Sequence, residues 1–147
     1  MIPARCADVA LAPAPIDPRW IVSGDPRARS AILASSADRG AWTVLWERSP
    51  GSFTWRYDFE ETVHFLAGSV LICSPGAPAR RYGAGDTLHF GRGSTAFWEV
   101  QTAIRKVAFC RHAPPRLLAH ALRAARGVHR RVAAIGGRSP AATLAGV

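Results

Sequence analysis

The sequence predicts an all-β domain, a small barrel or sandwich, followed by a basic amphipathic helix. Short runs rich in β-branched and aromatic residues follow one another from residue 41 to residue 110, separated by Gly, Pro, Asp or Ser. The chain has 147 residues, 48% of them hydrophobic, which suits one core and is too short for two full domains. No run reaches the roughly 18 apolar residues of a membrane-spanning helix. We therefore expect a cytoplasmic protein without a membrane partner.

Taken in order, residues 1–30 form a Pro-rich, partly extended N-terminal extension, with a short strand at 20–22 before a turn. The barrel is expected to span residues 31–113. Its first two strands are expected to form a hairpin across residues 49–51, where Pro and Gly stand together. The predicted strands of the barrel are 41–47, 53–57, 62–66, 69–73, 80–82, 87–90, 95–100 and 105–110.

The C-terminal end carries most of the net charge of +9. Residues 114–147 hold six Arg and no acidic residue. In residues 114–135 the apolar side chains fall on one helical face and the Arg side chains on the other, which predicts a basic amphipathic helix. We expect it to dock on the barrel or on a partner subunit; contact with a membrane surface or nucleic acid is the alternative. Since the tail has no aromatic residue to stack on bases, we do not expect a nucleic-acid partner. Residues 136–147 are expected to be disordered.

Two Gly-punctuated β segments, residues 46–68 and 82–100, carry the pattern that narrows the family. In the first segment Gly51 opens a motif in which six residues separate Glu61 from Gly68. The second segment contains Gly85 and Gly93 at matching places, with Trp98 and then the pair Arg105 and Lys106 further on. This pattern resembles the cupins, and most closely the cupin_3 or DUF861 group, which includes the ethanolamine-utilisation cupin and ureidoglycine aminohydrolase-like proteins. The resemblance implies a single small cupin β-barrel of the jelly-roll type.

The metal ligands of a typical cupin are mostly missing from this chain. Of the four ligands that the resemblance implies, only Glu61 is present. A divalent transition metal needs several His, Cys or carboxylate donors converging within about 2.0–2.3 Å, so one carboxylate does not suffice. We therefore expect no metal and no other cofactor. The positions of the three His hold Trp55 and Tyr57, or on another spacing Thr54 and Arg56, together with Ala96.

Strand alternation predicts an aromatic cavity inside the barrel. Side chains two residues apart share a face of a strand, so Phe53, Trp55 and Tyr57 point the same way. Trp98 shares the face of Ala96, which takes an inward position in the resemblance. We expect Phe53, Trp55 and Trp98 to bind a ligand; a core packed solid by these rings is the alternative.

Glu61, Tyr57 and Lys106 are the candidate catalytic residues. A carboxylate buried among aromatic rings is costly unless it is paired, and the desolvation of such a group suits general acid or base chemistry. Lys106 is the only Lys among 19 basic residues, and it stands where the resemblance expects a Lys. It is expected to pair with Glu61 or to hold an anionic group, with Tyr57 sharing the hydrogen bonds. An ordinary surface pair of Arg105 and Lys106 is the alternative.

Two function classes follow from the sequence. In the first, the barrel binds a small polar metabolite without a metal and acts on it weakly or not at all; the resemblance implies nitrogen-containing or carboxylated metabolites. In the second, the barrel is a non-catalytic binding or oligomerisation module with a packed interior. The resemblance also implies a homodimer.

Overall fold

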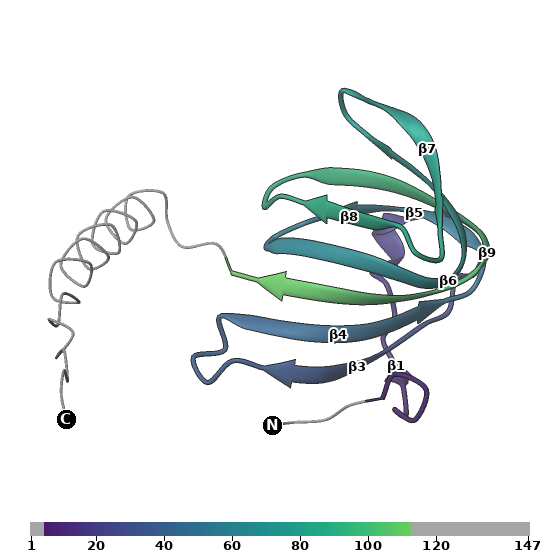
Figure 1. Cartoon of the computed structure of the whole chain (residues 1–147). Helices are drawn as coiled ribbons and strands as arrows, with labels where there is room; N and C mark the ends of the chain where they lie inside the picture. Colours follow the sequence, from purple (N-terminus) through teal and green to yellow (C-terminus); the bar gives the residue numbers. More distant parts are fainter. Residues whose placement is uncertain (1–4, 113–147) are drawn as a thin grey trace, which may run out of the picture. The chain divides into compact units, whose positions relative to one another are not determined.

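The computed structural model describes residues 5–112, so the predicted tail helix (114–135) and disordered tail (136–147) lie outside the described residues. Nearly all regular structure in this range is β-strand, which confirms the all-β prediction (Figure 1). No helix within the described range has the length and hydropathy needed to cross a membrane. The elements are β1 (Ala12–Pro13), η1 (Pro18–Trp20), β2 (Ile21–Ser23), β3 (Ala28–Ser35), β4 (Ala41–Arg48), β5 (Gly51–Arg56), β6 (Glu60–Ser74), β7 (Ala77–Gly83), β8 (Thr87–Phe90) and β9 (Thr95–Arg111).

Two long strands, β6 and β9, run through the whole sheet and hold it together. They pair antiparallel almost from end to end, from Glu60 opposite Arg111 to Cys73 opposite Phe97. The other edge of β9 pairs first with β5 and then with β4, while the other edge of β6 pairs with β8 and then with β7. The sheet therefore has two halves that share β6 and β9, and it curls around an interior (Figure 1).

The predicted hairpin between residues 41–47 and 53–57 is wrong. The two strands exist as β4 and β5, but each pairs with β9 and they do not pair with each other. Ser49 and Pro50 form a corner, because Gly51 has a φ of +141° and the amide of Ser49 donates to the carbonyl of Arg27. β4 and β5 consequently follow one another along the same edge of β9. Pairing with a distant strand has overridden the local turn signal.

Two further predictions about strands also need correction. Residues 62–66 and 69–73 belong to one strand, β6, and residues 95–100 and 105–110 belong to one strand, β9. The Gly and polar residues between them bend the strands without ending them, and the β6–β9 register shifts between Phe65 and Val70. The sequence pattern also gave no strand at β3, an Ala-rich segment whose apolar Ile32 is 68% exposed.

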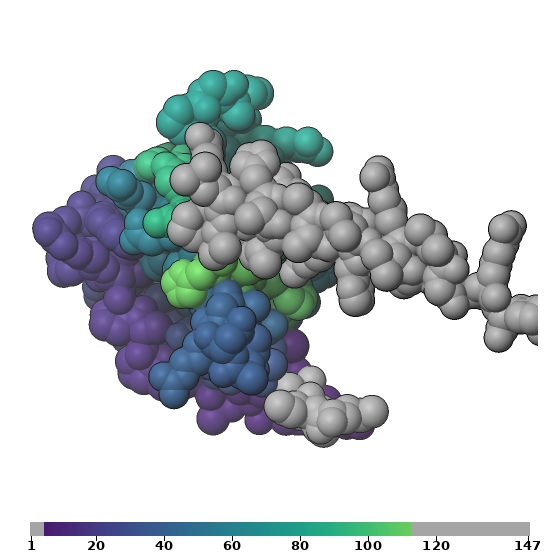
Figure 2. Space-filling model, turned by 90° about the vertical axis from the view of Figure 1, so that its left-hand side faces the viewer, coloured from purple at the N-terminus to yellow at the C-terminus, as the bar shows by residue number. Residues whose placement is uncertain are grey.

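The first 30 residues contribute edge strands to the sheet. β1 pairs with β3, and β2 pairs with β5. Ile16 lies in the core between these two short strands, at 6% exposure. At the far side of the sheet, the β6–β7 hairpin projects into solvent at the top of Figure 2, in teal, and residues 75–81 are all exposed.

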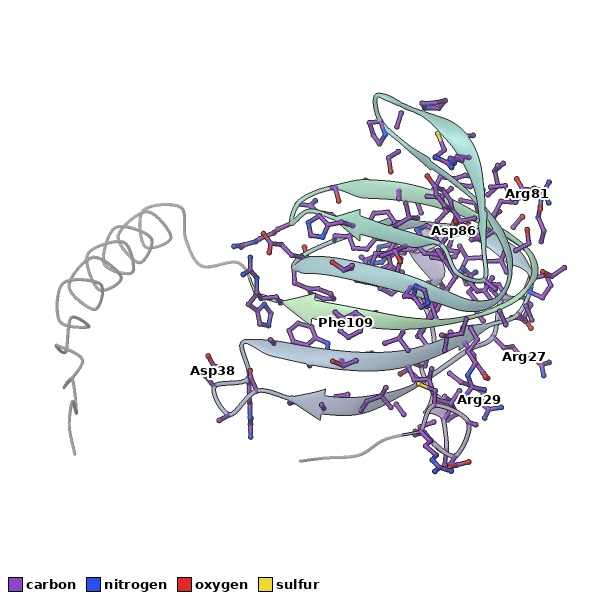
Figure 3. All side chains as sticks on the ribbon, in the orientation of Figure 1. Arg27, Arg29, Asp38, Arg81, Asp86 and Phe109 are labelled. Carbon is purple, nitrogen blue, oxygen red and sulfur yellow. The ribbon has the colours of Figure 1, made fainter. Side chains whose placement is uncertain are left out.

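The two faces of the curled sheet differ in chemistry. The inner face is apolar and aromatic, with Phe53, Trp98 and Val63 each at most 1% exposed. The outer face carries polar and charged side chains, together with the 53% exposed ring of Phe109 on β9 (Figure 3). The chain thus separates an enclosed aromatic interior from a polar exterior.

Gly68 makes the bend of β6 possible, and its substitution tests this role. A Cβ at this position would lie 2.2 Å from the carbonyl oxygen of Ala103 on β9, and the φ of Gly68 is +86°. Gly76, in the exposed hairpin, has nearly the same φ of +81° but no heavy atom within 4 Å of such a Cβ. We expect Gly76→Ala to lower the free energy of unfolding by about 1 kcal/mol and Gly68→Ala by about 3 kcal/mol or more. Chemical denaturation of both variants measures the difference, and equal losses would contradict the role of the close approach.

Candidate functional site

A cavity of about 280 Å³ lies on the inner face of the sheet. All six residues that the sequence singled out are among those that line it. These residues come from β5, β6, β9 and the segment after β5, which the β5–β9 and β6–β9 pairings bring together. The lining residues are Ala14, Pro15, Ser30, Trp42, Val44, Trp46, Phe53, Trp55, Tyr57, Phe59, Glu61, Trp98, Lys106, Ala108 and Cys110.

Glu61 and Lys106 form a buried ion pair in this cavity. The Lys106 Nζ lies 2.6 Å from the Glu61 Oε1, and the two side chains are only 9% and 6% exposed. Lys106 stands opposite Phe65, and Glu61 stands opposite Cys110. The two residues are therefore not directly paired across the strands, and their side chains meet diagonally between β6 and β9. The expected pairing is present, and Lys106 is not half of a surface pair. Its neighbour Arg105 points outward and binds Glu47 at 2.7 Å.

Aromatic rings surround the Lys106 ammonium. Its Nζ lies 4.9 Å from the Trp46 ring centroid and 5.0 Å from that of Trp98. Such cation–π contacts offset part of the desolvation of a buried ammonium. Trp98 stacks on Phe53 with centroids 5.7 Å apart, and Trp46 lies edge-on to Trp55 at 6.3 Å. The positive charge of Lys106 is thus held in an aromatic box.

Tyr57 supplies a neutral hydroxyl at the same site. Its hydroxyl oxygen accepts a 3.2 Å hydrogen bond from the Trp98 Nε1, and its ring stacks on Phe90 at 4.3 Å. Burial, and next the negative charge of Glu61, raise the pKa of Tyr57 well above its ordinary value, while the Trp98 hydrogen bond acts in the opposite direction. The hydroxyl therefore keeps its proton at neutral pH and can donate it in a hydrogen bond. No acceptor for that proton lies among the described residues.

Several residues that line the cavity were not predicted from the sequence. Trp42, Val44 and Trp46 stand at alternate positions of β4, so the same parity rule that found Phe53 and Trp55 could have found them. Ala14 and Pro15 follow β1 and Ser30 lies in β3, where no sequence signal pointed inward. Cys110 lies opposite Glu61 on β9, and burial raises the pKa of its thiol to about 12.

The cavity does not fit the metal that cupins typically hold. Among its lining residues only Glu61 and Cys110 are of metal-ligand type, and the Glu61 carboxylate is already bound to an ammonium. No cluster of three or more His, Cys, Asp or Glu that could hold a metal occurs within residues 5–112. His64 and His89 face away from the cavity, where their Nδ1 atoms pair with Thr87 and Thr62 at 2.9 and 3.0 Å.

A second, wider depression of about 590 Å³ lies over the outer ends of β4, β6 and β9. Thr43, Thr62, His89 and Phe109 are among its lining residues, and the ion pair of Glu60 with Arg111 lies in it. The Arg111 side chain is 63% exposed, so this pair is solvated and not held in a fixed enclosed geometry. The inner cavity is therefore the candidate site.

Comparison with protein families gives one match, a EutQ-like cupin domain, over residues 35–108, which is half of the chain. The matched range contains the candidate residues of β5, β6 and β9. The comparison with curated proteins gives no significant match.

The fold is similar to several solved structures. A protein of unknown function of the DUF861 family from Pseudomonas syringae has a TM-score of 0.64 and 21% identity, covering 70% of this chain but only 45% of its own. A putative ethanolamine utilization protein Q from Salmonella typhimurium has a TM-score of 0.52 and 18% identity, covering 60% of this chain and 72% of its own. The Cnp3 cupin domain of Schizosaccharomyces pombe has a TM-score of 0.59 and 11% identity, covering 76% and 70%. At these identities the likeness shows the fold alone.

The buried ion pair can be tested by removing one partner at a time. Glu61→Gln leaves a buried ammonium without its counter-charge, so we expect the free energy of unfolding to fall by about 3 kcal/mol. The double variant Glu61→Gln with Lys106→Met should lose less than the sum of the two single losses, because neither charge is then stranded. In the same two strands, Glu60→Gln breaks the exposed pair with Arg111 and should cost less than about 1 kcal/mol. Urea denaturation of these three variants and of Lys106→Met alone measures the losses; additive losses at 61 and 106 would contradict the pairing.

The raised pKa of the Cys110 thiol predicts that the protein loses stability at alkaline pH. Its pKa is raised in the folded chain to about 12, above an ordinary value of 9.0, so the folded state holds a proton that the unfolded state releases. This contribution to stability is complete below pH 9 and falls as the pH rises toward 12. We expect Cys110→Ala to show a smaller decline of the unfolding free energy between these pH values than the unaltered protein. Denaturation at a series of pH values measures it, and parallel curves would contradict the assignment.

Proposed function

Because the chain belongs to the EutQ-like cupin family, we propose that it binds a small polar metabolite in the aromatic cavity of its barrel, without a metal at the family's usual site. The observation that carries this proposal is the Glu61–Lys106 pair inside a hollow, ring-lined interior. A pocket that is mostly apolar with a few convergent polar groups is the usual form of a small-molecule site.

Unused hydrogen-bond donors support binding. An ammonium carries three N–H donors, and Lys106 uses one of them to donate a hydrogen bond to Glu61. Tyr57 accepts from Trp98 and keeps its own hydroxyl proton free for a ligand. The second oxygen of Glu61 has no hydrogen-bond partner among the described residues and is free to accept. A ligand with both donor and acceptor groups would satisfy all three side chains.

The same three groups are those that general acid–base chemistry would use. A carboxylate, an ammonium and a protonated phenol line the same cavity. The Lys106 ammonium already donates a hydrogen bond to the Glu61 carboxylate. We propose binding as the primary function and weak turnover of the bound metabolite as its extension. A homodimer stays a prediction from the family resemblance.

The size and the relatives guide the choice of test compounds. A cavity of about 280 Å³ takes a compact molecule with few non-hydrogen atoms. The similar Salmonella protein is named for ethanolamine utilization, so ethanolamine belongs in the panel. Small ureido compounds, hydroxy acids, short carboxylic acids and their neutral amides complete it.

Thermal denaturation in the presence of each compound tests the proposal. Binding to the folded state alone raises the melting temperature, and a concentration of 100 times the Kd adds about 2.7 kcal/mol to stability. We expect at least one compound to stabilise the protein, and Glu61→Gln and Trp98→Ala to remove that effect. Trp98→Phe serves as a milder variant, since it keeps a ring and loses the hydrogen bond to Tyr57.

Phe109→Ala is the matched control. It removes an aromatic ring from the same strand as Trp98, but from the exposed outer face. Compound-dependent stabilisation should persist in this variant. Absence of any stabilisation across the panel, or equal loss in Phe109→Ala and Glu61→Gln, would reject binding in the cavity.

A further inference from the structure

Arg48 is a buried charge with no hydrogen bond or ion pair to any residue between 5 and 112. The residue is 1% exposed, and the Nε, Nη1 and Nη2 atoms of its side chain make no hydrogen bond to any described residue. A guanidinium carries five N–H donors, and burying an ion without a counter-charge or acceptors costs considerable free energy. Proteins rarely keep such a group inside unless something binds it.

The surroundings of Arg48 place it directly behind the cavity wall. Its guanidinium carbon lies 3.5 Å from the ring centroid of Phe53, and that ring lines the cavity. Across the sheet Arg48 stands opposite Ala28 on β3 and Ile104 on β9, neither of which is acidic. A single aromatic ring therefore separates the free guanidinium from the space in which a ligand would lie. The cation–π contact with Phe53 offsets part of the buried charge, but it accepts no N–H hydrogen bond in the plane of the guanidinium.

The charges of the interior do not balance. Lys106 and Arg48 are positive and Glu61 is negative, while Glu47, the sequence neighbour of Arg48, faces outward and binds Arg105. Burial lowers the pKa of Arg48 to about 10, which leaves it protonated at neutral pH. The buried side chains around the cavity thus carry one net positive charge.

The aromatic rings of the cavity do not favour a cationic ligand. Aromatic boxes commonly bind ammonium groups, but here Lys106 already lies against Trp46 and Trp98. A cationic ligand would add to an excess of positive charge, and a neutral ligand would leave it unchanged. Only an anionic ligand would remove it.

We propose that the cavity binds a small monocarboxylate, whose charge is balanced by Lys106 inside the cavity and, at longer range, by Arg48 behind the Phe53 ring. This inference rests on the proposed binding function and names its ligand class. The carboxylate accepts the free N–H donors of Lys106, Arg48 acts on it through its charge from behind the Phe53 ring, and Glu61 keeps its ion pair. The predominantly aromatic wall, with Trp55 and Trp98 on one side and Trp42 and Val44 on another, fits a short apolar chain on the acid.

Propionate and propionamide form the probe pair, because they have nearly the same shape and differ in charge. Melting temperatures of the full chain are measured with sodium propionate and with propionamide plus an equal concentration of sodium chloride. We expect stabilisation by propionate that grows with concentration, and little effect of the amide with salt. In Arg48→Met the Kd for propionate should rise at least ten-fold. The same variant should melt higher than the unaltered protein when no ligand is present, since an unpaired buried charge has been replaced by an apolar side chain.

Two further variants serve as controls for Arg48→Met. Arg48→Lys keeps the charge and should retain part of the propionate response that Arg48→Met loses. Arg56→Met removes an exposed Arg from the outer face of β5 and should leave the response unchanged. Propionate stabilisation no larger than that of sodium chloride or the amide, an unchanged response in Arg48→Met, or a lower ligand-free melting temperature of Arg48→Met would overturn the inference.

The outcomes also separate this inference from the proposed function. If a neutral or cationic compound stabilises the protein, and Glu61→Gln but not Arg48→Met removes the effect, the cavity binds metabolites and the carboxylate assignment is wrong. If neither propionate nor any other compound stabilises the protein, both proposals fail together.

Discussion

The pairing of β6 with β9 is the constraint on which the rest of the molecule depends. These two strands pass through both halves of the sheet, so any enclosure requires both to bend at the same level. The bend is possible because Gly68 brings its backbone against Ala103 and Ile104, closer than any side chain would allow. Once the sheet has curled, the alternate positions of β4, β5, β6 and β9 face each other across a common interior. The backbone geometry of β6 and β9 thus determines where the cavity lies, and the side chains determine what it can bind.

Enclosure then decides which charges the interior can hold. A carboxylate at position 61 cannot lie among Phe, Tyr and Trp rings without a counter-charge, and the usual metal cannot supply one without further ligands. Lys106 provides it from the neighbouring strand, at 2.6 Å, and the rings of Trp46 and Trp98 help to stabilise the ammonium. The counter-charge of Glu61 is thus an internal ammonium. The aromatic rings that line the cavity and the single Lys of the chain are therefore two parts of one arrangement.

Much of this site could be predicted because strand alternation is a local property. The inward direction of Phe53, Trp55, Tyr57 and Trp98 follows from parity alone, and the motif spacing placed Glu61 among them. What sequence could not give was pairing between distant strands. The signal at residues 49–51 indicated a hairpin, whereas β4 and β5 both bind β9, and the parity of Lys106 became clear only from the register Phe65 opposite Lys106. β3 was missed because an Ala-rich edge strand with an exposed Ile32 carries little alternation.

Arg48 shows why the unpredicted residues matter for function. It follows Trp42, Val44 and Trp46 on the inner face of β4. It is therefore a charged residue at a position where this pattern leads one to expect an apolar residue. Packing alone would favour Met or Leu at this position, since the pocket around the side chain offers a ring and aliphatic neighbours but no acceptor. Sequences usually satisfy packing, polar pairing and local preference together, and departures from this agreement concentrate at functional sites. The ion pair of Glu61 and Lys106 departs from an apolar core but is internally satisfied. Arg48 is not satisfied by the described part of the chain, and it lies directly behind the Phe53 ring, which is part of the cavity wall.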